Sequence, residues 1–189
     1  TLITHSSNYA RFLGYDVRVR RNNDVRKAGN TTQRTLSQTA ELAIPLNDKI
    51  MRFLFDKKVI NQSKNGEIKP WTRLALTRCS DLEIVTAYNA ELRGICNYYS
   101  LASNFGKLNY FAYLMEYSCL KTLACKHKTT IAKIIRRNKD GKGKWRIAYK
   151  NKKGDCSHRT IQGSRLYFTK SRDKCSTLLN VAWSRSPII

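Results

Sequence analysis

Residues 80–126 constrain the fold of this chain most, because their apolar residues recur every three or four positions, as they do along one face of a helix. The first helix is expected to begin at the capping box Ser80-Asp81-Leu82-Glu83. In such a box the serine hydroxyl accepts a hydrogen bond from the amide of residue 83, and Glu83 reaches back to the start of the helix. The apolar face continues to about Leu101, and Asn104-Phe105-Gly106 then predicts a stop and a turn.

A second long helix is predicted from Lys107 to about Lys126. Its apolar residues form one stripe: Leu108, Phe111, Met115, Cys119 and Thr122. Three further residues lie close to that stripe: Leu114, Tyr117 and Leu120. A helix whose apolar residues spread so far around its circumference is expected to be covered on more than one side.

The residues before this pair of helices show weaker patterns. Alternating polarity over residues 13–20 predicts a half-buried strand, followed by a turn at Asn22-Asn23 and a short return strand over residues 24–27. Residues 36–44 predict a further extended segment. Helical spacing appears over residues 47–59. Residues 28–34 and 61–70 are polar and contain glycine, so they are expected to be loops.

The residues after the pair of helices are less regular. Thr129 is expected to cap a short helix that ends at Arg137, and strands are expected at 145–150 and 165–169 with a loop between them. Trp145 is expected in a small core rather than stacked on a base. The sequence thus predicts an α+β fold, mainly a bundle of three to four helices. A small β-hairpin precedes the bundle, and a basic region of irregular or β structure follows it.

The positive charge of the chain is large and unevenly distributed. The chain contains 36 Lys and Arg against 13 Asp and Glu, a formal net charge of +23. Residues 1–60 have a net charge of +6 and residues 61–120 of +1, whereas residues 121–189 have +16. Because self-repulsion opposes folding, this excess predicts a polyanionic partner, of which nucleic acid is the commonest and a membrane surface the next. The most apolar run, residues 108–120, is too short to span a membrane, so no membrane partner is expected.

The six cysteines lack the spacing of a zinc site or of a redox pair. Cys96 and Cys119 fall within apolar helical patterns, which is typical of buried free thiols in a reducing compartment. The first twenty residues do not have the pattern of a signal peptide.

A glycine in the middle of the first long helix needs an explanation, because glycine costs a helix about 1 kcal/mol relative to alanine. Gly94 lacks a Cβ and so permits another backbone to approach closely. That backbone belongs either to a second helix or to a nucleic-acid strand. Asn97 and Tyr98 lie off the main apolar face, where they either contact bases and sugars or pack with their polar groups bonded inside the protein.

The segment around this glycine resembles a known family. LEIVTAYNAELRGICNYYSLASNFGKLNYFAYLMEYSCLKTLACKHKTTIAKI closely resembles domain X, the thumb, of group II intron-encoded reverse transcriptases and maturases, most of all of lactococcal members. The run Y-N-x-E-L-R-G-x-x-N-Y-Y is its most specific part. Upstream, RFLGYDVRVRRN resembles the last conserved strand of the polymerase palm, and TAELAIPLNDKIMRFLFDKKVI resembles the segment that leads into the thumb. The stretches KDGKGKW and YKNKKG fit more loosely, and the resemblance extends over roughly residues 9–155.

The resemblance implies a division into three parts. Residues 1–44 would be the end of the palm, residues 45–137 the thumb or domain X, and residues 138–189 the start of a basic DNA-binding region. The Y-A-D-D loop of the catalytic palm and the family's endonuclease module are not found in this sequence. The chain therefore looks like part of an RNA-directed DNA polymerase that has no catalytic residues, metal or cofactor of its own. Mg²⁺ is expected only with the palm and with the intron RNA.

In the family, the thumb contacts the template–primer during reverse transcription and binds the intron RNA to assist its splicing. The expected partners are therefore group II intron RNA, template–primer or target DNA, and the palm and fingers of the polymerase. A bacterial cytoplasm or an organellar matrix is the expected location. Three alternatives stay open: the thumb of an active polymerase, a target-DNA-binding module formed by residues 138–175, and a non-functional remnant of a mobile element.

Basic residues at helical spacing are the first candidates for RNA contact, because lysine and arginine bind phosphates. Any one of them is equally well explained as a solvated surface charge. The first group lies on the helices predicted at residues 107–126 and 129–137 and in the turn between them: Lys121, Lys126, Lys128, Lys133, Arg136 and Arg137. The second group lies in the expected loop and strand after them: Lys139, Lys142, Lys144 and Arg146. The third group surrounds the glycine: Arg93, Asn97 and Tyr98.

Overall fold

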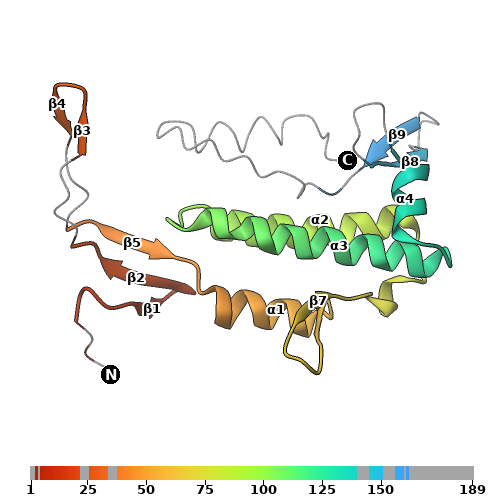
Figure 1. Ribbon diagram of the computed structural model, residues 1–189, viewed down its shortest axis with the longest axis horizontal. Helices are drawn as coiled ribbons and strands as arrows, with labels where there is room; N and C mark the ends of the chain where they lie inside the picture. Colours follow the sequence, from red (N-terminus) through yellow and green to blue (C-terminus); the bar gives the residue numbers. More distant parts are fainter. Residues whose placement is uncertain are drawn as a thin grey trace.

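The computed structural model describes residues 3, 5–21, 26–33, 38–139, 145–150, 156–159 and 161. Within these ranges the chain forms four α-helices and several small antiparallel sheets (Figure 1). Two long helices, α2 and α3, lie side by side along the middle of the molecule, with a small sheet at one end and helix α4 at the other (Figure 1). The predicted α+β class, mainly helical, is confirmed.

The N-terminal sheet contains three strands in the order β1 (Ala10–Phe12), β2 (Tyr15–Val19) and β5 (Ala40–Ala43). The strand predicted over residues 13–20 is confirmed by β2, and β5 confirms residues 40–43 of the segment predicted over 36–44; the two strands pair with each other. Glu41 on β5 accepts hydrogen bonds from Arg18 of β2 and from Arg20 just after it, and also from Ser103, beyond the end of α2. The bond from Arg20, with those from Ser103 and Arg18, lowers the pKa of Glu41 to about 2 although burial opposes its ionisation.

Two hairpins lie wholly or largely in segments that were predicted as loops. Strands β3 (Arg26–Ala28) and β4 (Thr31–Gln33) pair across the turn at Gly29, whose φ of +61° favours glycine. Arg26 and Lys27 fall in the predicted return strand, but they pair with β4 and not with β2, so the predicted hairpin partner was wrong. Strands β6 (Ile60–Gln62) and β7 (Ile68–Pro70) pair in the same way. Both pairs are short and mainly polar, so neither shows the alternation that identifies a strand from sequence.

The helix predicted over residues 47–59 is shorter and less regular than expected. A π-helical turn, Leu46–Ile50, leads into α1 (Met51–Asp56). The helix then ends because Lys58 adopts a left-handed conformation, with φ of +54°, and the Val59 amide turns back to the Leu54 carbonyl. Leu54, Val59 and Ile60 are buried against the helical pair.

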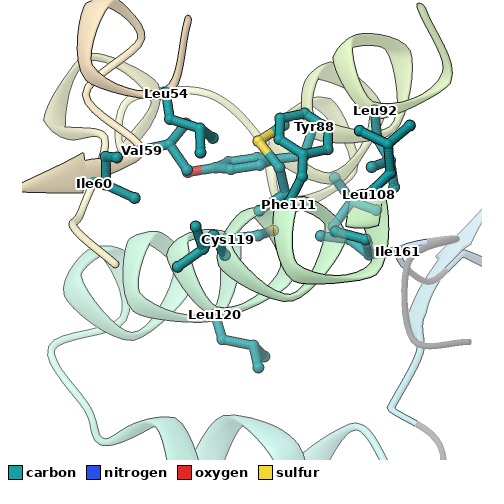
Figure 2. Close-up of a cluster of buried hydrophobic side chains, with 14 of the residues drawn as sticks. Leu54, Val59, Ile60, Tyr88, Leu92, Leu108, Phe111, Cys119, Leu120 and Ile161 are labelled. Carbon is teal, nitrogen blue, oxygen red and sulfur yellow. The ribbon is translucent and has the colours of Figure 1, made fainter. Parts of the chain in front are cut away.

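Helix α2 (Asp81–Tyr98) begins at the predicted capping box, in which Ser80 and Glu83 bond each other's backbone amides. A 3₁₀ turn (Phe105–Lys107) follows and continues directly into α3 (Leu108–Lys126). The core forms where the two helices meet, and Figure 2 shows several of its residues: Tyr88, Leu92, Leu108, Phe111 and Cys119. The Tyr88 hydroxyl lies 2.8 Å from Ser118 Oγ and 3.1 Å from Thr122 Oγ1, so this buried polar group is satisfied.

The stripe predicted on α3 is buried over its whole length: Leu108, Phe111, Met115, Cys119 and Thr122. Leu114 and Leu120 are buried too, so the helix is covered on more than one side as expected. The prediction was wrong for Tyr117, whose side chain is exposed. It lies in an exposed row with Tyr110 and Tyr113 on the same helix.

Helix α4 (Ile131–Arg137) ends where predicted, but its cap is Thr130 and not Thr129. Strands β8 (Ile147–Lys150) and β9 (Cys156–Arg159) form a hairpin beside it (Figure 1). Trp145 is buried and donates to Glu116 Oε1 at 2.9 Å, which confirms its place in the core. Strand β8 confirms the strand predicted at residues 145–150, whereas β9 lies in the segment predicted as a loop, so that prediction was wrong. The strand predicted at residues 165–169 lies outside the described residues.

Cys96 and Cys119 are buried free thiols, as predicted, whereas Cys125 near the end of α3 is exposed. Burial raises the pKa of Cys96 to about 11 and raises that of Cys119 as well. These thiols are therefore protonated at neutral pH and contribute as small apolar side chains. Within the described ranges, no helix is both long and apolar enough to cross a bilayer.

Candidate nucleic-acid interface

Helix α4 presents a cationic face because its three isoleucines all pack toward the core. Thr130 accepts a hydrogen bond from the Lys133 amide and so starts the helix. Ile134 is 3% exposed, and two neighbours at helical spacing, Ile131 and Ile135, pack against the same core. This packing leaves the remaining long side chains of the helix in solvent: Lys133, Arg136 and Arg137.

No acid within residues 117–139 offsets the positive potential at α4. Residues 117–139 contain seven Lys or Arg and no Asp or Glu. In the part of the chain that the structure describes, Lys133, Arg136 and Arg137 form no ion pair. Adjacent like charges in solvent repel each other, and a phosphate backbone would relieve that repulsion.

Two of the cations predicted on α3 are bonded inside the protein instead. Lys121 Nζ donates to the Pro70 carbonyl at 2.8 Å. Lys126 Nζ donates to the Cys79 carbonyl at 2.8 Å and forms an ion pair with Asp81 at 2.5 Å. These two lysines fasten the segment before α2 to α3, and their contact with RNA stays a prediction.

Asp81 is the acid at the centre of this fastening. Its Oδ2 atom lies 2.7 Å from His127 Nε2, and its Oδ1 atom accepts from Lys126. Burial of the carboxyl group raises its pKa, but the hydrogen bonds from Lys126 and His127 outweigh burial and hold the pKa below the usual value. Asp81 is therefore ionised at neutral pH, where it also suits the N-terminus of α2.

The other cations near α4 are dispersed. Lys128 is exposed in the turn between α3 and α4, with φ of +47°. Lys139 is exposed and pairs through its backbone with Trp145, while the Arg146 amide donates to the Asn138 carbonyl at 2.7 Å. Lys142 and Lys144 lie outside the described residues.

Gly94 faces open space rather than another helix. A Cβ placed on this glycine would meet no atom within 4 Å, so the interpretation as tight packing within this chain is wrong for the described structure. Arg93 and Asn97 are exposed beside it. This face of α2 thus permits a close approach by a partner, as the second interpretation requires.

Tyr98 joins the end of α2 to the N-terminal sheet. Its hydroxyl donates to the Leu13 carbonyl, and its ring stacks on Tyr15 with the ring centres 5.7 Å apart. The Tyr15 hydroxyl in turn donates to the Tyr98 carbonyl. A Cβ on Gly14, whose φ is +77°, would lie 2.7 Å from the Tyr98 hydroxyl, so only glycine fits that turn. The Tyr98 side chain is still 53% exposed, which leaves much of it accessible.

The predicted residues therefore form two separate surfaces. One comprises α4 and the turn before it, and the other comprises Arg93, Gly94 and Asn97 near the N-terminal sheet. The sheet and α4 lie at opposite ends of the α2–α3 pair (Figure 1). Sequence analysis could not show this separation, because both surfaces arise from helix direction and from contacts between distant segments. It also missed the exposed tyrosines of α3.

The geometry above agrees with the match to a family of known proteins. The model of the type II intron maturase family matches residues 37–173, more than half of the chain. The chain belongs to the type II intron maturase family. The resemblance seen in residues 82–134 is therefore confirmed, and these helices are those of a maturase domain of the kind found in group II intron-encoded proteins.

Individual relatives support the same conclusion. The group II intron-encoded protein LtrA of Lactococcus lactis subsp. cremoris is 60% identical over 154 residues, which are 82% of this chain and 26% of LtrA. Maturase K of Metasequoia glyptostroboides is 31% identical over 133 residues, 69% of this chain and 25% of that protein. A putative COX1/OXI3 intron 1 protein of Saccharomyces cerevisiae is 31% identical over 145 residues, 72% of this chain and 17% of that protein. The chain thus spans about a quarter or less of the length of these relatives.

Proposed function

We propose that this maturase domain binds group II intron RNA and assists its splicing by holding the RNA in its folded form. The observation that carries the proposal is the face of α4, where Lys133, Arg136 and Arg137 are exposed and lack ion-pair partners among the described residues. Phosphate contacts need cations of this kind. A lysine or arginine already neutralised by an acid has no net charge to offer a phosphate, so its contact releases no counterions from the RNA. The domain contributes binding energy, and the bond-breaking chemistry belongs to the RNA.

A second role is favoured by the face of α2 around Gly94. This face is open, and Tyr98 fastens it to the β1–β2 turn. It would contact the template–primer in reverse transcription, together with the palm and fingers of the same polymerase. In both roles we expect Mg²⁺ to be held by the palm and by the RNA rather than by the residues of this domain. The buried thiols Cys96 and Cys119 support a reducing compartment, the bacterial cytoplasm or an organellar matrix.

The decisive experiment reverses the charge of α4. The variant K133E/R136E/R137E is compared with wild type for binding to the intron transcript at several salt concentrations. We expect more than tenfold weaker binding at moderate salt. The salt dependence should also become shallower by ~0.9 per lost contact on duplex regions and ~0.7 on single strands. Far-UV circular dichroism should stay unchanged, because the three side chains are exposed.

A matched control tests whether the position of the reversed charges, and not the change in net charge alone, weakens RNA binding. The variant K49E/R52E/K64E changes the net charge by the same amount. Its three residues are exposed and lie away from α4, at the start of α1 and in the β6–β7 turn. It should bind nearly as wild type. Equal affinity of the α4 variant and wild type would remove the proposal. Competition of the intron transcript with a target DNA duplex at the same salt tests the alternative role as a DNA-binding module.

A further inference from the structure

Helix α3 carries a row of exposed aromatic side chains that the binding surfaces described above do not include. Tyr110, Tyr113 and Tyr117 are 54%, 51% and 38% exposed. Their positions differ by three and four residues, so they share one side of the helix. The rings of Tyr110 and Tyr113 are stacked with their centres 6.4 Å apart, and those of Tyr113 and Tyr117 are 5.5 Å apart. The tyrosine row is thus one continuous aromatic surface.

The tyrosine row occupies the part of this side of α3 that α4 does not cover. Continuing the spacing of Tyr113 and Tyr117 along the helix leads to Leu120 and Ala124, which are 3% and 7% exposed. Figure 2 shows Leu120 extending from α3 toward α4, away from the core around Tyr88. The same side of α3 is therefore covered by α4 in its second half and exposed in its first half. The row consequently continues toward the helix that carries the cationic face.

The hydroxyl groups of the row also differ from those of the structural tyrosines. Tyr15, Tyr88, Tyr98 and Tyr99 all bond their hydroxyl groups to protein atoms. The hydroxyl groups of Tyr110, Tyr113 and Tyr117 form no hydrogen bond with the residues that the structure describes. Three large rings that neither pack in the core nor use their polar groups contribute little to the fold, so they are available to a partner.

We propose that the tyrosine row is a stacking surface for unpaired bases of the bound RNA. This inference rests on the proposed function and specifies which part of the RNA contacts α3. Charge favours RNA over a protein partner: the chain has a net charge of +23, and Lys107 is exposed one turn before Tyr110. The one acid in this part of α3, Glu116, is engaged with Trp145.

Ring chemistry selects unpaired bases rather than a duplex. Every base has a flat face that stacks on an aromatic ring, so a row of tyrosines binds a strand with little sequence preference. In a duplex these faces are covered by the neighbouring base pairs, and only loops, bulges and ends expose them. The tyrosine row would thus bind a loop of the intron while α4 contacts phosphates.

The test compares two triple variants of the full chain on two RNAs. Y110L/Y113L/Y117L keeps apolar side chains with good helix propensity but removes the rings, whereas Y110F/Y113F/Y117F keeps the rings and removes the hydroxyls. The RNAs are an intron-derived hairpin with an unpaired loop and the same stem closed into a continuous duplex. The leucine variant should lose about tenfold affinity for the looped RNA per ring that stacks. It should bind the duplex as wild type does, with an unchanged salt slope. The phenylalanine variant should stay within about twofold of wild type on both RNAs.

The outcomes separate this inference from the proposed function. If the leucine variant binds looped RNA as well as wild type does, or loses looped and duplex RNA equally, the stacking surface is disproved. Full RNA binding with weaker stimulation of splicing would assign the row to a protein partner and would also disprove it. In either case, a loss of binding in the α4 charge variant would leave the proposed function standing. If the α4 variant also binds normally, the proposed function fails as well.

Discussion

The end of α3 and the whole of α4 carry the same kinds of side chain but use them differently. Lys121 and Lys126 on α3 donate to backbone carbonyls, and Lys126 also donates to Asp81, so their ammonium groups are bonded within the fold. Lys133 and Arg136 on α4 are exposed and have no ion-pair partner among the described residues. The difference shows that a basic stretch is not one surface, because an acid or a carbonyl from elsewhere decides which cations remain available to a partner.

Several arginines earlier in the chain are likewise held by acids. Arg18 and Arg20 are both held by Glu41, and Arg73 forms a paired contact with Glu91 at 2.8 and 3.0 Å. These arginines bind acids, whereas residues 117–139 contain no Asp or Glu, and Lys126 pairs with an acid only by reaching Asp81.

The largest effect should come from separating α4 from α3. Ile134→Ala removes a buried side chain that packs against the core, and it should lower the free energy of unfolding by about 2–4 kcal/mol. Urea denaturation measures this loss. RNA binding should weaken at the same time if the cations of α4 act only when α4 is docked. Normal RNA affinity in this variant would show that they do not depend on docking.

A smaller loss of stability should distinguish a lysine bonded within the fold from an exposed one. Lys126→Met should cost about 1.5–3 kcal/mol of unfolding free energy, because Asp81 and the Cys79 carbonyl lose a charged donor. Lys133→Met removes an exposed charge and should change stability by less than about 0.5 kcal/mol. RNA affinity should show the reverse order, with Lys133→Met the weaker binder. Similar behaviour of the two variants in both measurements would break the comparison.

The smallest loss of unfolding free energy should appear on acidification, when Glu41 is protonated. Glu41 has a pKa of about 2 in the folded chain and 4.5 as its ordinary value, so its contribution is complete above pH 4.5. That contribution is lost as the pH falls from 4.5 toward 2, when the carboxylate is protonated and releases Arg20 and Arg18. We expect about 1–2 kcal/mol, because both arginines are partly exposed and solvent screens the pairs. Thermal unfolding of wild type and Glu41→Gln between pH 2 and pH 6 measures it, and parallel pH profiles would contradict this role.

Local rules explain which predictions were confirmed. The capping box at Ser80 and the apolar stripe from Leu108 to Thr122 depend on residues three or four positions apart, so they are visible in one sequence. The β6–β7 hairpin was missed because its strands are short and mainly polar, and their stability comes from packing on α1 and α3. Tyr117 was placed in the core because its spacing resembles that of Leu120, and only the position of α4 distinguishes the two.

The sequence by itself determined the helical pair, the family and the concentration of positive charge, since periodicity, a specific motif and composition need no long-range contact. Only the tertiary structure decided how that charge is divided. The acceptors for Lys121 and Lys126 lie 51 and 47 residues earlier in the chain, at Pro70 and Cys79. Whether a lysine meets such an acceptor or meets water depends on how distant segments pack, and no local pattern records that packing.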